Sequence, residues 1–69
     1  MSNFSERLLA LRKERKLNQE EVVAEFDLSI RSYRRYDTGN GEPTLSTLWK
    51  IADFYGVSVD YLIGRSEER

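Results

Sequence analysis

The sequence contains no cysteine and no histidine. Without cysteine the chain forms no disulfide bond and has no thiolate nucleophile, and without both residues it lacks the commonest zinc ligands. Imidazole, the most frequent general acid or base of enzymes, is missing as well. We therefore expect a protein that is not an enzyme and that uses neither a metal nor another cofactor.

Long apolar segments are also missing. No run of hydrophobic residues approaches the roughly 18 that a membrane-spanning helix needs, and residues 1–20 lack the hydrophobic core of a signal peptide. We expect a soluble cytoplasmic protein with no membrane partner and no evident small-molecule ligand. At 69 residues the chain is long enough for one domain.

Positive charge is scarce overall but concentrated locally. The net charge is -1, yet residues 29–36 carry three arginines and no acid, whereas residues 18–28 carry four acids and no base. A polyanionic partner responds to such a local patch rather than to the total. The segment "SIRSYRRY" at 29–36 is therefore the candidate anion-binding surface.

Helix signals recur along the chain, and no strand is predicted. Apolar residues spaced three and four apart predict a first helix over residues 4–15, and Asn18 followed by Glu21 is the capping pattern of a second. Later helices are predicted from cap and stop residues at Ser29 and Gly39, at Thr44 and Gly56, and at Ser58 and Gly64. The apolar stripe predicted for the fourth helix comprises Leu45, Leu48, Ile51, Ala52 and Tyr55.

Only "DLS", residues 27–29, joins the second and third predicted helices. So short a connector requires a sharp angle, and two short helices of which the second is basic are typical of a helix-turn-helix motif. A five-helix bundle without a ligand explains the same spacing, so this pattern alone leaves both interpretations open.

Residues 4–64 resemble the XRE-type helix-turn-helix family, which includes phage repressors and Cro proteins. The similarity is carried by "LRKERKLNQEEVV" at 11–23, "LSIRSYRRYDTG" at 28–39 and "EPTLSTLWKIADFYGVSVDYLIG" at 42–64. It implies an all-α, compact five-helix, lambda-repressor-like DNA-binding domain over residues 1–64, followed by a polar C-terminal tail at 65–69 that we expect to be frayed. It also implies double-stranded DNA as the partner and binding as a homodimer.

The resemblance assigns site residues position by position. Gln19 matches a glutamine that touches a phosphate and braces the third helix, and Arg34 is expected to contact a phosphate or remain in solvent. Arg31 and Arg35 also have a physical argument, because residues four apart share a helix face and arginine can donate two hydrogen bonds to guanine. The expected DNA-binding set is Gln19, Ser29, Ile30, Arg31, Ser32, Arg34, Arg35, Thr38 and Asn40.

Other positions carry alternatives. Ile30 either meets a thymine methyl group or folds back against Leu28, while Tyr33 and Tyr36 are expected to pack inward. Arg12 matches a partner of the acid at position 37, but aspartate there is one methylene shorter than the usual glutamate, so the ion pair is expected to be long or absent. Asp27 replaces a glycine common in the turn.

A departure from the family pattern affects the expected function. The connector after Gly39 lacks the bases found in relatives, which predicts modest affinity and a shallow salt dependence. The dimer contact is expected through Val57, Val59, Tyr61 and Ile63, or through Trp49 if that side chain is exposed rather than part of the core.

The leading hypothesis is a sequence-specific transcriptional regulator, a phage or bacterial repressor whose third helix reads a palindromic operator in the major groove. The alternative is a protein-interaction module, antirepressor-like or antitoxin-like, that retains the fold.

Overall fold

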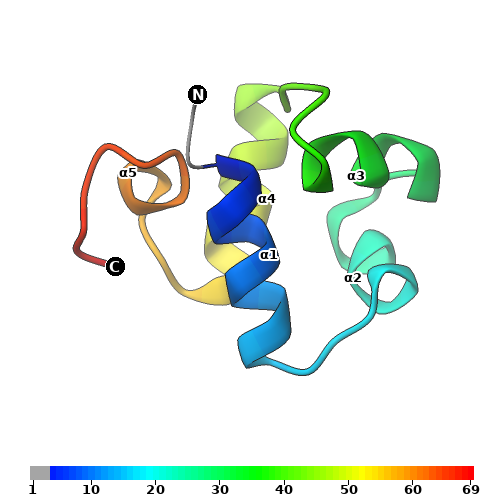
Figure 1. The fold of residues 1–69 in the computed structure, drawn as a ribbon, viewed down its shortest axis with the longest axis horizontal. Coiled ribbons are helices and arrows are strands. Elements are labelled where there is room, and N and C mark those ends of the chain that lie inside the picture. The colour runs from blue at the N-terminus through cyan, green and yellow to red at the C-terminus, as the bar shows by residue number, and fades with distance from the viewer. Residues whose placement is uncertain (1–3) are drawn as a thin grey trace.

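The computed structural model describes residues 4–69, which contain five helices and no β-strand (Figure 1). This confirms the predicted all-α class. The first predicted helix ends one residue early, at Glu14. The helices are α1 (Phe4–Glu14), α2 (Gln19–Phe26), α3 (Ile30–Asp37), α4 (Leu45–Tyr55) and α5 (Val59–Leu62).

Each helix after α1 is preceded by a residue whose side chain accepts a hydrogen bond from a backbone amide three positions on. Asn18 accepts from the Glu21 amide at 2.8 Å, and the Glu21 carboxylate accepts from the Asn18 amide at the same distance. Such caps satisfy backbone donors that would otherwise lack an intrahelical partner. The corresponding caps of α3, α4 and α5 are Ser29, Thr44 and Ser58.

The turn between α2 and α3 depends on a left-handed residue. Asp27 ends α2 with φ 57° and ψ 44°, and its amide donates to the Val23 carbonyl. Aspartate adopts this conformation more readily than most residues with a Cβ atom, although less readily than glycine. The substitution at the usual glycine position is therefore accommodated with the turn geometry preserved.

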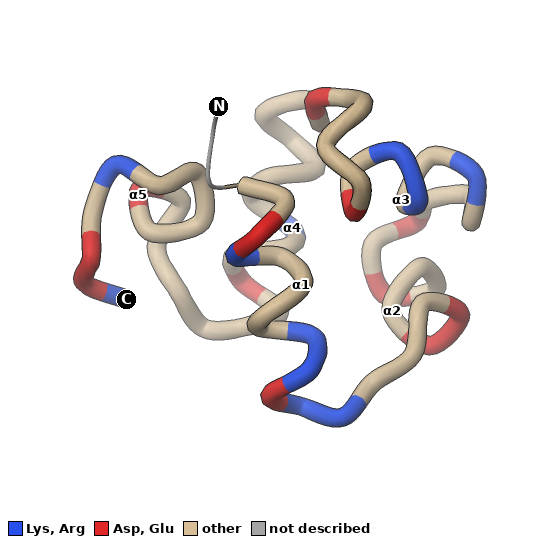
Figure 2. The backbone as a smooth tube through the Cα atoms, viewed as in Figure 1, with Lys and Arg blue, Asp and Glu red and all other residues tan. Residues whose placement is uncertain are grey.

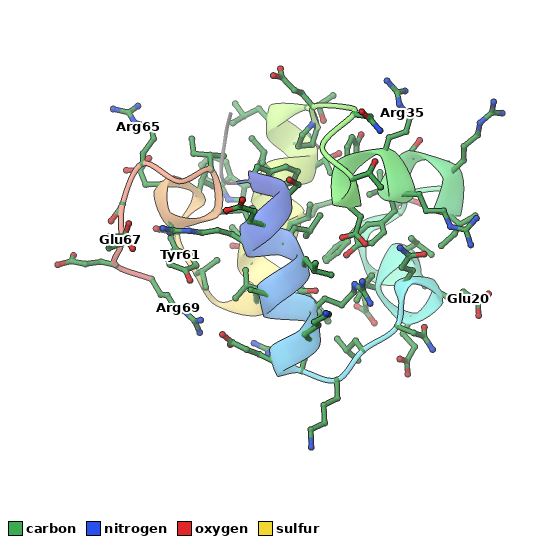
Figure 3. All side chains as sticks on the ribbon, viewed as in Figure 1. Glu20, Arg35, Tyr61, Arg65, Glu67 and Arg69 are labelled. Atoms are coloured by element: carbon green, nitrogen blue, oxygen red, sulfur yellow. The ribbon has the colours of Figure 1, made fainter. Side chains whose placement is uncertain are left out.

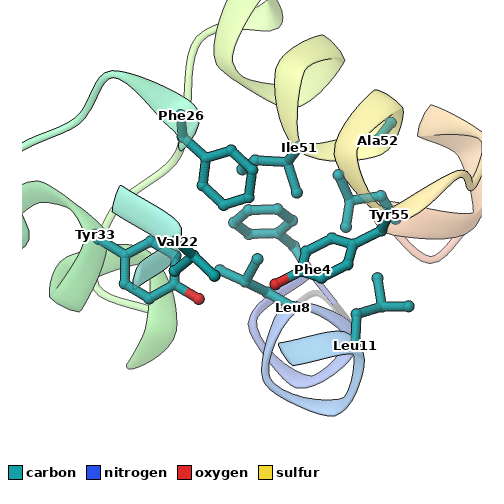
Figure 4. Close-up of a cluster of buried hydrophobic side chains, with 10 residues drawn as sticks. Phe4, Leu8, Leu11, Val22, Phe26, Tyr33, Ile51, Ala52 and Tyr55 are labelled. Carbon is teal, nitrogen blue, oxygen red and sulfur yellow. The ribbon is translucent and has the colours of Figure 1, made fainter. Parts of the chain in front are cut away.

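Side chains from all five helices form one hydrophobic core (Figure 4). Tyr33 on α3 is fully buried and stacks on Phe26 of α2, with ring centroids 6.4 Å apart. Tyr36 is half-buried, and its ring makes a T-shaped contact with the Phe4 ring. Both tyrosines therefore pack inward as predicted. The other fully or nearly fully buried members are Phe4, Leu8, Leu11, Val22, Ile51, Ala52, Tyr55 and Leu62.

The predicted apolar stripe of α4 is wrong at its first residue. Ile51, Ala52 and Tyr55 are buried, but Leu45 is 66% exposed. Leu45 occupies the first turn of α4, immediately after the connector, so the helix end projects beyond the core. Trp49 is 58% exposed, which excludes its interpretation as core filler.

α2 and α3 lie at one end of the molecule, and α5 with the C-terminal segment lies at the other (Figure 1). The expected fraying of residues 65–69 is not observed. The Arg69 carbonyl accepts from the Ser58 amide at 2.9 Å, and the Arg69 guanidinium pairs with Glu14 of α1. These contacts fold the tail back against α1 and α5. Within residues 4–69, none of the helices has the length and apolarity to cross a membrane.

Candidate DNA-binding interface

The outer face of α3 carries three exposed arginines. Arg31, Arg34 and Arg35 are exposed, whereas Tyr33, on the opposite side of the same helix, is 0% exposed. Ile30 is half-buried, which matches neither a fully exposed methyl-binding side chain nor a core residue. The buried tyrosine therefore sets the rotation of the helix that presents the arginines to solvent.

Polar side chains hold both ends of α3. The Ser29 hydroxyl accepts from the Ser32 amide and donates to the Ser32 hydroxyl, each at 3.1 Å. At the other end, the Thr38 hydroxyl donates to the Arg34 carbonyl at 2.9 Å, and the Asn40 side-chain amide donates to Thr38 at 3.1 Å. The structure thus places four candidate DNA-binding residues at the boundaries of the basic helix, where they also stabilise it.

Arg35 extends from α3 beside the connector that leads to α4 (Figure 3). A Cβ atom added to Gly41 would meet the Arg35 Cβ at 3.3 Å and its Nε at 3.4 Å. The missing side chain at position 41 therefore leaves room for the Arg35 stem. The connector contributes to the site by this close approach, although it lacks basic residues.

A chain of hydrogen bonds runs from the interior to the arginine face. Arg12 of α1 donates to Asp37 Oδ2 at 3.2 Å, and the two side chains are only 14% and 8% exposed. The side-chain amide nitrogen of Gln19 donates to the same carboxylate oxygen at 2.9 Å. Arg34 Nε then donates to the Gln19 side-chain oxygen at 3.2 Å. The shorter aspartate therefore still reaches Arg12, against the expectation that this pair is long or absent.

The chain of bonds fixes the orientation of Gln19. Because a carboxylate only accepts, the Gln19 amide nitrogen must face Asp37, and its oxygen must face away from it. That oxygen meets Arg34, which links α2 to the basic helix. The sequence resemblance indicated that Gln19 braces the third helix, but the specific partners, Asp37 and Arg34, could not be inferred from spacing.

The buried hydroxyls of Tyr33 and Tyr55 point toward one another in the core (Figure 4). Burial raises the pKa of Tyr55 to about 12. Burial, reinforced by the negative charge of Asp37, raises the pKa of Tyr33 well above its ordinary value of 10. Both phenols therefore remain neutral in the folded domain under conditions that ionise them in an unfolded chain.

We expect alkaline pH to destabilise the domain through these two tyrosines. Their folded pKa values are raised, so their contribution is complete below pH 10 and is lost as the pH rises toward the folded values, near 12 for Tyr55. In that window, each of the two tyrosines lowers the free energy of unfolding by about 1.4 kcal/mol for every pH unit. Urea denaturation at successive pH values measures the slope, and Tyr55→Phe should remove about half of the tyrosine contribution. An unchanged slope in that variant would contradict this assignment.

The charge around the basic helix is mixed. Figure 2 shows positive positions on α3 and near the end of α1, with acidic positions on α2 beside them. Glu20 and Glu21 occupy the first turn of α2, where their negative charges interact favourably with the helix dipole. The positive surface is therefore narrow, and α3 supplies its centre.

Two short helices, α2 and α3, are joined by only three residues, and the second is basic with its arginines exposed. This arrangement is typical of a helix-turn-helix motif. The profile of the helix-turn-helix family matches residues 8–62. The chain belongs to the XRE-type helix-turn-helix family. This family membership agrees with the resemblance inferred from its sequence.

Known relatives of this family member include phage and bacterial regulators. The chain is 42% identical over 64 residues to the cryptic phage CTXphi transcriptional repressor RstR of Vibrio cholerae, covering 93% of this chain and 58% of RstR. It is 37% identical over 67 residues to the HTH-type transcriptional regulator YqaE of Bacillus subtilis, covering 96% of this chain and 58% of that protein.

A solved structure supports the same fold. The crystal structure of a transcriptional regulator from Listeria innocua superposes with a TM-score of 0.89 at 26% identity, covering all of this helix-turn-helix chain and 64% of that chain. The chain thus spans a little under two thirds of the length of each of these three proteins.

Proposed function

We propose that this helix-turn-helix domain is a sequence-specific DNA-binding transcriptional regulator that acts as a repressor. The observation that carries the proposal is the exposed arginine face of α3, held in place by the buried Tyr33 and by the Arg12–Asp37 pair. The similarity to a phage repressor, RstR, supports the same class of activity. Repression then follows from occupancy of an operator, which needs no chemical step by the protein.

In this proposal α3 enters the major groove. Arg31 and Arg35 are exposed and carry long donors suited to guanine O6 and N7, while the smaller Ser29 and Ser32 allow close approach to the backbone. Arg34, tied to Gln19, is directed toward a phosphate. Thr38 and Asn40 mark the far border of the contact. Ile30 is half-buried, and the part of its side chain that remains exposed at the start of α3 is assigned to a thymine methyl group.

The operator is expected to be a palindrome bound by a homodimer. Two half-sites recognised by two-fold related reading helices lie about 34–36 Å apart, one turn of DNA. Because three arginines supply most of the positive charge of the face, few phosphates are neutralised, and the salt dependence should be shallow. Joining two modest half-sites in one dimer offsets the weak affinity of each.

Selection of binding sites from random duplex DNA at two salt concentrations tests the proposal. We expect enrichment of a palindrome with half-sites one turn apart, at both salt concentrations. A charge-matched control carries Arg31→Lys and Arg35→Lys, which keep both positive charges while removing the planar guanidinium groups that can donate two parallel hydrogen bonds to guanine, and it should lose the sequence preference of the parent. Failure of the parent to enrich any sequence even at low salt would favour the protein-interaction module instead.

A further inference from the structure

The two exposed large hydrophobic side chains among residues 4–69 lie on the same face of α4. Leu45 is 66% exposed and Trp49 is 58% exposed. Residues four apart are neighbours on a helix surface, so the two form one apolar patch. With Ser46, Lys50 and Asp53 they line a shallow groove of about 610 Å³. These five residues are called the α4 face below.

We propose that a second copy of this chain docks on the α4 face, so that α4 of one copy pairs with α4 of the other about a two-fold axis. In such an interface the same patch must be complementary to itself. The α4 face meets that condition, because it combines an apolar stripe with one lysine and one aspartate, Lys50 and Asp53. An antiparallel pairing brings Lys50 of each copy to the side where the other carries Asp53.

The charge balance of the α4 face argues against DNA as its occupant. Lys50 and Asp53 cancel, so the groove offers no net attraction to phosphate, unlike the arginine face of α3. An exposed tryptophan beside an aliphatic side chain is instead the composition that protein interfaces favour at their centres.

The side of α5 that carries Tyr61, an alternative dimer surface, is already covered by other parts of the chain. The guanidinium groups of Arg7 and Arg69 lie over the Tyr61 ring, 4.1 Å and 5.3 Å from its centroid. Arg7 also donates to the Tyr61 carbonyl at 2.9 Å and to the Ser66 carbonyl at 2.7 Å. α1 and the C-terminal segment thus occupy the side of α5 that carries Tyr61, whereas Leu45 and Trp49 of the α4 face are exposed.

The α4 face is placed to relate two reading helices. It begins at Leu45, directly after the connector that carries Gly41, and Arg35 of α3 packs against that glycine. A two-fold axis through this face therefore also relates the two α3 helices, each joined to its own α4 by the connector at residues 38–44. The link to paired half-sites rests on the proposed function, but self-association is measured without DNA.

A charge exchange tests the interface. Sedimentation equilibrium of the complete chain should show dimerisation of the parent, weakened about tenfold by Asp53→Lys, because each copy then sets two positive charges against each other. The double variant Lys50→Asp with Asp53→Lys should restore the parent constant to within about twofold. Glu25→Lys makes the same charge change at an exposed position of α2 and should leave dimerisation unaltered.

Fluorescence gives an independent measurement, because Trp49 is the only tryptophan. Its emission should shift to shorter wavelength as the parent dimerises and should fail to shift in Asp53→Lys over the same concentrations. A parent that sediments as a monomer throughout, or an Asp53→Lys variant that dimerises like the parent, overturns the interface. A chain that dimerises in this way but selects no DNA sequence overturns the proposed function alone.

Discussion

Asp37→Ala should remove about 3–5 kcal/mol from the free energy of unfolding, which is most of the stability expected for a domain of this size. The Asp37 side chain is 8% exposed and accepts hydrogen bonds from Arg12 and from Gln19. Alanine would leave a buried guanidinium without its counter-charge, and that uncompensated charge accounts for most of the loss. Urea denaturation followed by circular dichroism measures the change.

Two further variants separate this electrostatic cause from a general sensitivity to substitution. Glu25→Ala removes an exposed carboxylate from α2 and should change stability by no more than about 0.5 kcal/mol. Arg12→Met combined with Asp37→Leu replaces both charges with apolar side chains and should recover at least half of the loss. A loss below about 1 kcal/mol in Asp37→Ala would show that the pair is not important to the fold.

The stability of the Arg12–Asp37 pair also bears on the DNA-binding surface. Asp37 orients the side-chain amide of Gln19, and Gln19 in turn holds Arg34 by a bond of 3.2 Å. A substitution in the interior therefore releases a side chain on the arginine face. Binding measured on Asp37 variants must be interpreted together with their folded fraction.

The features of the fold that could be predicted from sequence are mainly local. A capping side chain and the amide that it bonds are three residues apart, so Asn18 and Ser29 could be identified without knowing where the helices pack. The inward direction of Tyr33 follows from helical periodicity in the same way.

The features that could not be predicted depend on how separate helices meet. Whether aspartate at position 37 reaches Arg12 is decided by the spacing of α1 and α3. The bond between Gln19 and Arg34 depends in turn on how α2 is placed against α3. The exposure of Leu45 is of the same kind. Leu45 belongs to the apolar stripe of α4 by its spacing in the sequence, but the first turn of that helix lies outside the core.

The second large effect concerns Arg31, whose replacement by alanine should weaken binding to the selected operator by about 1–3 kcal/mol. The loss should be concentrated at one base pair of each half-site, so preference at that position relaxes while other positions keep theirs. Arg31 is exposed at the first turn of α3, on the side away from Tyr33, and its guanidinium can donate two parallel hydrogen bonds to guanine. Titration against the operator and against single-base variants measures both effects.

Arg34→Ala provides the matched comparison on the same helix. Arg34 is held by Gln19 and is assigned to a phosphate, so its loss should weaken all sequences alike and reduce the salt slope by about 0.9 for each half-site. Gln19→Ala should reproduce part of this effect, because it releases Arg34 while leaving its charge. Equal binding by the parent and Arg31→Ala, or a change of base preference in Arg34→Ala, would contradict the assignment of these two arginines. Both side chains are exposed, so a stability change within about 0.5 kcal/mol would place any loss of affinity at the DNA contact rather than in the fold.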